Sequence, residues 1–219
     1  VNMSADPEQE YFTDGLSEEI LNLLAQIRDL KVIGRTSSFA FKGRNEDLRT
    51  IGNTLGVAYL LEGSVRKAGD DLRIIAQLIL VDDGSHVWSQ SYDRKLENVF
   101  AIQSEIAAAI AEALKINLLA AGQSVPVAQA AASLPAYELF LQARPLIQGR
   151  TRAGLEAARG LLDQALKLDP NYAPALAAKA QAVLLLNNQW DGYGDFTLDQ
   201  AHAIAEPLLD KALALDPML

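Results

Sequence analysis

The chain has 219 residues, half of them hydrophobic and 21% charged, which is typical of a globular protein with one large domain or two small ones. The net charge is −9, and no basic region is large enough to neutralise several phosphates, so we expect no direct nucleic-acid binding. No apolar run of about 18 residues is present, so we expect no membrane span in this segment; the absence of cysteine excludes disulfides and thiolate metal sites.

The first 120 residues predict an α/β domain with an antiparallel meander in a mixed sheet. Apolar residues at helical spacing predict a helix over 16–30, with Asp14 or Ser17 as its N-cap. A β-branched run predicts a strand over 31–36. The other elements expected here are a helix at 48–55 closed by Gly56, a hairpin of strands at 58–67 and 72–81, a third strand at 86–93 and a helix at 97–119.

The rest of the chain predicts a linker followed by helices. Residues 121–135 are rich in Ala, Gln, Ser and Pro and lose the amphipathic pattern, so we expect a linker between domains 1–120 and 136–219. Four helices are expected over 136–148, 152–168, 172–187 and 198–215. Between the last two, residues 188–197 contain Asn, Asp and Gly and predict a loop.

A ten-residue stretch occurs twice in this helical part, 47 residues apart. Residues 161–170 read LLDQALKLDP and residues 208–217 read LLDKALALDP, with eight of ten positions identical. Such a repeat predicts stacked copies of one helix pair, an architecture that usually binds other proteins. The small Ala165 and Ala212 should allow close helix packing, and Asp-Pro should end each helix.

The helical part resembles tetratricopeptide repeats. Ala158, Ala165, Leu176 and Ala180 match small and large positions of that family, and the match covers about 85 residues. It departs from the family in its longer repeat and in Pro145 within a helix. We therefore expect two repeat units over 136–219 that bind a protein or peptide, with self-association as an alternative.

The first part resembles the TolB amino-terminal-like domain. The stretches DPEQEYFTDGLSEEI (6–20), VIGRTSSFAFKG (32–43), LGVAYLLEGSVRKAGDDLRIIAQL (55–78) and HVWSQSYDRKLENVFAIQSEIA (86–107) carry this resemblance. Such a domain before tetratricopeptide repeats is similar to the C-terminal region of bacterial class III adenylate/guanylate cyclase-like proteins and of membrane-anchored winged-helix regulators. The resemblance implies an output domain N-terminal to this segment, so we expect a piece of a longer bacterial protein that lies in the periplasm or, alternatively, the cytoplasm.

No pattern of catalytic, cofactor-binding or metal-binding residues stands out, so we expect no catalytic site, cofactor or metal. His86 and His202 lack a nucleophile or metal-ligand spacing, and we assign them structural roles. Asp82 and Asp83 are expected as solvated turn residues. The stretch 191–195 carries two carboxylates around glycines but lacks the further oxygen ligands that Ca²⁺ requires.

The loop after the third predicted helix concentrates aromatic residues. Trp190, Tyr193 and Phe196 either fold back onto the helices or form a contact surface for a partner. We interpret the chain as a non-enzymatic sensory or scaffolding segment that binds a partner or ligand and regulates a cyclase-like or transcriptional output domain. The alternative is an enzyme with a nucleotide pocket in the α/β domain.

Overall fold

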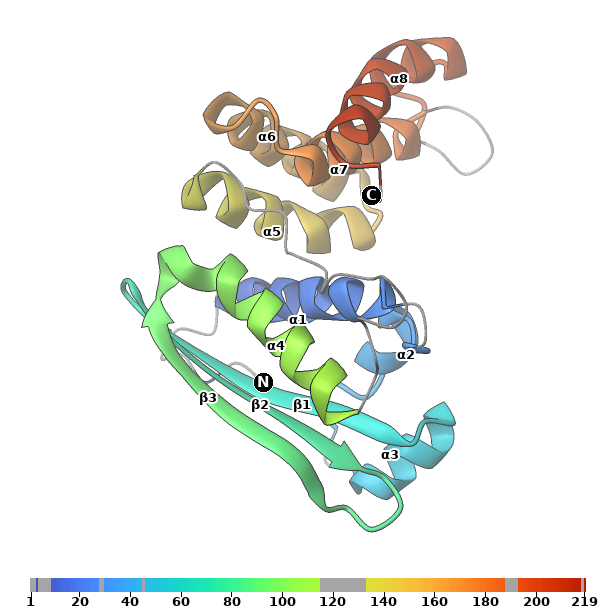
Figure 1. The fold of residues 1–219 in the computed structure, drawn as a ribbon. Coiled ribbons are helices and arrows are strands. Elements are labelled where there is room, and N and C mark those ends of the chain that lie inside the picture. Colours follow the sequence, from blue (N-terminus) through green and yellow to red (C-terminus); the bar gives the residue numbers. More distant parts are fainter. Residues whose placement is uncertain are drawn as a thin grey trace. The chain divides into compact units, whose positions relative to one another are not determined.

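The computed structural model describes residues 3, 9–27, 30–44, 46–114, 133–187, 193–217 and 219. The chain divides into two compact units, 1–129 and 130–219, and each is described here by itself (Figure 1). The predicted linker 121–135 lies almost wholly outside the described residues.

The first unit contains a three-stranded antiparallel sheet in the order β1-β2-β3. The strands are β1 (Tyr59–Ala68), β2 (Asp71–Leu80) and β3 (His86–Lys95). β1 and β2 pair along their whole length, and Gly69 occupies the turn between them with a φ of 60°. This confirms the predicted hairpin and third strand. Within the described residues the sheet is wholly antiparallel, whereas a mixed sheet was predicted.

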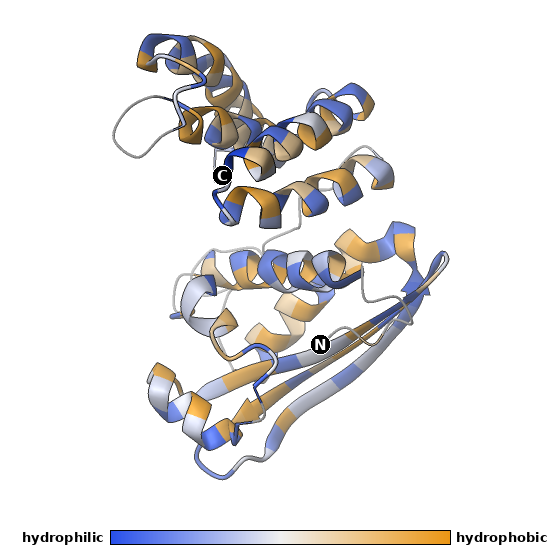
Figure 2. Cartoon of the chain, turned by 180° about the vertical axis from the view of Figure 1, so that it is seen from behind, coloured by the Kyte–Doolittle hydropathy of each residue, from blue (hydrophilic) through white to orange (hydrophobic). Residues whose placement is uncertain are grey.

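Two helices cover one face of this sheet, α1 (Glu10–Ala25) and α4 (Val99–Ala113), with the short 3-10 helix η2 (Leu96–Asn98) leading into α4 (Figure 1). The core lies where the two helices meet the middle strand. It contains Phe12, Leu16, Leu72, Ile74, Ile102, Ile106 and Ile110, each at most 3% exposed. Apart from Val87, Trp88 and the buried Tyr92, β3 is polar and mostly exposed, and Figure 2 shows its largely hydrophilic colouring.

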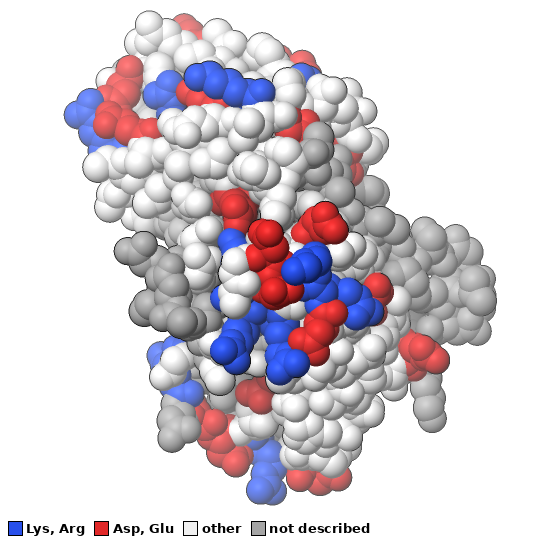
Figure 3. Space-filling view, turned by 90° about the vertical axis from the view of Figure 1, so that its left-hand side faces the viewer, with Lys and Arg blue, Asp and Glu red and all other residues white. Residues whose placement is uncertain are grey.

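The opposite face of the sheet carries paired charges. The carboxylate of Asp93 lies 2.5 Å from Arg73 across β2 and β3, and Asp71 lies 2.7 Å from Lys95. Cross-strand pairs of opposite charge suit a solvated sheet face, because directly opposed like charges would destabilise it. Figure 3 shows acidic and basic side chains interleaved on the face that it presents.

One predicted element in this unit is wrong, and the helix predicted over 16–30 is present with other bounds, Glu10–Ala25. The strand over 31–36 is absent: α2 (Arg35–Phe39) begins after Gly34, and the Ser38 hydroxyl donates to the Gly34 carbonyl. This local bond offers the backbone an alternative to strand pairing. α1 begins six residues before the predicted start, so Ser17 lies inside the helix and donates to the Thr13 carbonyl instead of capping it. Asp14 also lies inside α1.

The helix α3 (Leu48–Leu55) has the predicted bounds. The Asp47 side chain accepts a hydrogen bond from the Arg49 N–H at its start, and Gly56 ends it in the left-handed region with a φ of 66°. Glycine adopts this left-handed conformation readily because it has no Cβ. Both ends of α3 are therefore determined by local sequence.

The second unit consists of α5 (Leu134–Gln148), α6 (Arg152–Leu168), α7 (Ala173–Leu185) and α8 (Leu198–Leu215). α5 packs against α6, α6 against α7, and α7 against α8. Side-chain caps from Ser133, Thr151 and Thr197 begin three of them. Pro145 is accommodated within α5. All four predicted helices are present within one or two residues at each end.

The two copies of the sequence repeat have the same local structure. Asp169 and Asp216 end α6 and α8 with φ values of −137° and −140°, and each N–H donates to the carbonyl four residues earlier over 2.8 Å. Ala165 and Ala212 are both fully buried. The sequence repeat therefore corresponds to a structural repeat at the C-terminal ends of these two helices.

Candidate functional site

The predicted aromatic loop lies against α6 as far as it is described. The Phe196 ring lies 5.0 Å from the guanidinium carbon of Arg159, and the Tyr193 hydroxyl donates to the carbonyl of Arg150. Asp195 forms an ion pair with Arg152. Phe196 is half-buried, whereas Tyr193 remains 41% exposed. Trp190 lies outside the described residues, and the other two predicted contact residues, Tyr193 and Phe196, contact different residues, Arg150 and Arg159.

The other residues considered from sequence lie apart from this loop or outside the described part of the chain. His86 is exposed on β3, and His202 is exposed on α8. Asp83 accepts a hydrogen bond of 2.8 Å from the Ser85 N–H, and hydrogen bonding from Ser85 lowers the pKa of this exposed carboxyl. Among the residues that the structure describes, no group of three or more His, Asp or Glu side chains could hold a metal ion, and no helix is long and apolar enough to cross a membrane.

The clearest exposed apolar surface of the second unit lies on α8. We call Leu209, Asp210 and Leu213 the α8 outer face: Leu209 lies one turn from the buried Ala205 and Ala212, and the exposed Asp210 and Leu213 lie beside it. Leu213 is 50% exposed and Leu209 is half-buried. Their counterparts in the first copy are better covered: Leu162 is fully buried. Leu209 and Leu213 are thus more exposed in α8 than their counterparts are in α6.

The sequence pattern predicts an incompletely covered apolar face on this helix, although Leu209, Asp210 and Leu213 were not among the predicted contact residues. From periodicity alone, Leu162 and Leu209 are expected to be equally buried, since both follow the same pattern in α6 and α8. The helical contacts distinguish them, because α6 has helices α5 and α7 packed on it and α8 has α7. The face is identified when the exposure of each residue of one repeat copy is compared with that of its counterpart in the other copy.

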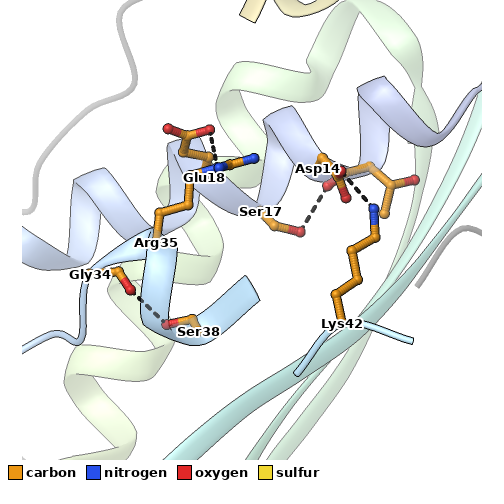
Figure 4. A network of polar contacts seen from close by, with 8 residues as sticks. Asp14, Ser17, Glu18, Gly34, Arg35, Ser38 and Lys42 are labelled. Atoms are coloured by element: carbon orange, nitrogen blue, oxygen red, sulfur yellow. Dashed lines mark hydrogen bonds and ion pairs between the residues drawn. The ribbon is translucent and has the colours of Figure 1, made fainter. Parts of the chain in front are cut away.

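A polar network links α1 to the segment around α2 in the first unit (Figure 4). The Lys42 ammonium lies 2.6 Å from Glu10 and 2.7 Å from Asp14, and Arg35 lies 2.9 Å from Glu18. Arg35 also stacks on the Phe39 ring at 4.3 Å. These contacts hold the stretch that was predicted as a strand against α1, so we assign the network a positioning role.

The Lys42 cluster makes stability depend on pH. The hydrogen bond from Lys42 lowers the pKa of the Glu10 carboxyl from its ordinary value. Burial acts to lower the pKa of Lys42, but hydrogen bonds to Asp14 and Glu10 outweigh it and raise that pKa above its ordinary value. A carboxyl whose pKa is lowered by folding stabilises the fold above its ordinary pKa and loses that contribution as the pH falls through the lowered value.

We therefore expect Lys42→Met to reduce the acid sensitivity of the first unit. Thermal unfolding from about pH 6 to about pH 3, followed by circular dichroism, should show a smaller loss of Tm for this variant than for the wild type, because the Glu10 pKa no longer differs between the folded and unfolded states. Arg44→Met is the matched control, since it removes the same charge from the same segment without touching Glu10. Identical pH profiles for Lys42→Met and the wild type would contradict this role.

No protein-family model matches the chain. Putative adenylate cyclase 3 of Rhizobium meliloti (strain 1021) is 40% identical over 211 residues, which make up 95% of this chain and 36% of that protein. The chain thus spans little more than a third of this relative's length. The relative associates the chain with a cyclase and indicates a bacterial source.

This relative overturns one prediction. From sequence we expected a segment that is not an enzyme; a protein named as an adenylate cyclase, aligned with nearly all of this chain, points to an enzyme instead. The expectation rested on the lack of a recognisable catalytic pattern in this chain. The chain aligns with only 36% of its relative, so that lack does not describe the rest of the longer protein.

Proposed function

We propose that this chain is part of an adenylate cyclase, and that its second unit binds a protein partner and thereby changes the rate at which the enzyme converts ATP to cyclic AMP. The observation that carries the proposal is the relative named as an adenylate cyclase, which aligns with 95% of the chain. In this proposal the first unit is a TolB amino-terminal-like domain, the second unit is a pair of tetratricopeptide-type repeats, and both lie in the periplasm.

The partner-binding part of the proposal is supported by the surface of the second unit. Large apolar side chains on the surface are favoured anchors in protein interfaces when they gather in one place. On α8, Ile204 and Leu215 are 37% and 40% exposed on one side of the helix, and Leu213 is 50% exposed on the opposite side. Tyr193 is exposed in the loop before α8. This unit therefore exposes large apolar side chains on two sides of one helix.

A competition experiment tests this function. The 219-residue chain, fused to an export signal that directs it to the periplasm, is expressed in excess in the native host beside the full-length protein, and the rate of cyclic AMP formation is measured. If the chain binds the regulatory partner, the excess should withdraw that partner and change the rate by more than about twofold, as expected by mass action.

The matched control for the competition is the same chain carrying Leu162→Asp. Leu162 is fully buried, so a charge there should unfold the second unit. This control should leave the cyclic AMP rate unchanged. A wild-type competitor with no effect, or an equal effect from the control, would contradict regulation through this unit.

A further inference from the structure

The stretch 31–44, which contains α2, is attached to the rest of the first unit in an unusual way. None of its residues is buried. Among the described residues its backbone hydrogen bonds stay within the stretch: the Ser38 N–H donates to the Gly34 carbonyl over 3.2 Å, and the Lys42 N–H to the Phe39 carbonyl over 3.0 Å. A segment without buried side chains or backbone bonds to its surroundings is one that can open locally, at a free energy below that of global unfolding.

Ion pairs join this stretch to α1, as Figure 4 shows. Arg35 lies 2.9 Å from Glu18, and Lys42 lies 2.6 Å from Glu10 and 2.7 Å from Asp14. In each pair the cation belongs to the stretch 31–44 and the carboxylate belongs to α1. The Arg35–Glu18 pair is the better covered of the two contacts, with 28% and 12% of its side chains exposed, so we regard it as the main attachment.

The charges of the two parts are fully separated. The stretch 31–44 contains four basic residues and no acidic one, in a chain whose net charge is −9. Glu10, Asp14 and Glu18 follow one another at intervals of four residues, which places them along one side of α1. Salt weakens such an attraction, because the Debye length falls from about 30 Å at 0.01 M to about 3 Å at 1 M.

We infer that residues 31–44 form an electrostatic strap, which leaves α1 as one unit while the sheet, α1 and α4 stay folded, and that ionic strength sets the fraction of open molecules. α2 has five residues and is too short to persist as a helix once it is detached. Opening therefore exposes the amides of α2 and the carboxylate of Glu18. The inference concerns the first unit alone and does not depend on the proposed function.

Amide hydrogen exchange of the 219-residue chain, followed by NMR at about 0.02 M and about 0.5 M NaCl and at one pH, tests the strap. The amides of Ser38 and Lys42 report on the strap, and those of Leu16 and Ile20 report on α1. Relative to a free peptide of residues 31–44, the strap amides should exchange about fivefold or more faster at the higher salt concentration. The α1 amides should exchange more slowly than the strap amides and change by less than about twofold.

Two arginines of the strap provide matched variants. Arg35 and Arg44 each lie over a phenylalanine ring, Phe39 at 4.3 Å and Phe41 at 5.7 Å, and each forms an ion pair. Only Arg35 has its carboxylate on α1, because Arg44 pairs with Glu46. Arg35→Gln should therefore speed the exchange of the strap amides by about fivefold or more at low salt and reduce their response to salt, whereas Arg44→Gln should change it by less than about twofold.

A double variant tests whether Arg35 and Glu18 act through one contact. Glu18→Gln should also speed the exchange of the strap amides, and the double variant should exchange no faster than the faster of the two single variants. A strap whose exchange does not respond to salt, or equal effects of Arg35→Gln and Arg44→Gln, would overturn the inference. A parallel acceleration of the α1 amides would do so too, because it would show that the strap and α1 open together.

Discussion

Replacing Leu162 with alanine should lower the free energy of unfolding of the second unit by about 2–5 kcal/mol, whereas the same change at Leu209 should cost clearly less. Leu162 is fully buried in α6, so truncation removes apolar contacts and leaves a cavity among helices. Leu209 is its repeat mate and is only half-buried, so water already reaches part of its side chain. The two substitutions have the same chemistry and the same position in the repeat.

Urea denaturation of the 219-residue chain, followed by far-ultraviolet circular dichroism, measures both free energies. Leu168→Ala serves as the control for a leucine of the same helix that is 51% exposed, and it should fall within about 0.5 kcal/mol of the wild type. Equal costs at Leu162 and Leu209 would show that the outer face of α8 is as well covered as that of α6, and would remove the basis for a docking site there.

The second large effect is expected at Gly52 in α3. A Cβ built on this glycine would lie 2.5 Å from one γ carbon of Val81 and closer still to the other. Val81 is 6% exposed and β-branched, so it has little freedom to move away. Gly52→Ala should therefore destabilise the first unit by about 1–3 kcal/mol, a cost that exceeds the gain of up to about 1 kcal/mol in helix propensity.

A double-mutant cycle with Val81→Ala isolates this contact. In the Val81→Ala background the two γ carbons are gone, so Gly52→Ala should become neutral or stabilising. Gly160→Ala in α6 is the matched control, because no atom lies within 4 Å of a Cβ built there, and it should stabilise by up to about 1 kcal/mol. If Gly52→Ala costs as much in the Val81→Ala background as in the wild type, the packing of α3 against the end of β2 is not as described.

Sequence reasoning predicted most elements of the fold because their signals are local. Gly56 and Gly69 require positive φ, and the Asp-Pro pairs at 169–170 and 216–217 end helices whatever surrounds them. The strand predicted over 31–36 failed because β-branched residues favour a strand only when a partner strand is available. In its place α2 begins after Gly34, the Ser38 hydroxyl donates to the Gly34 carbonyl within it, and Arg35 ties it to α1.

The candidate site was less predictable for a related reason. Which of two repeat mates is covered depends on the neighbouring helices, and that information is not contained in the ten repeated residues. The aromatic loop shows the same limit: a sequence pattern could not decide whether Phe196 folds back, and its contact with Arg159 depends on the position of α6. Burial and exposure of identical residues are properties of packing, so they required the structure.

The most direct test of the central claim couples the second unit to cyclase activity. Full-length proteins carrying Leu162→Asp or Leu168→Asp are compared with the wild type in the native host, at equal protein levels, by the rate of cyclic AMP formation. We expect Leu162→Asp, which places a charge at a fully buried position and unfolds the second unit, to change the rate by more than about twofold, and Leu168→Asp, at a position that is 51% exposed, to leave it unchanged. Equal rates in all three proteins would contradict the claim that the second unit regulates the enzyme.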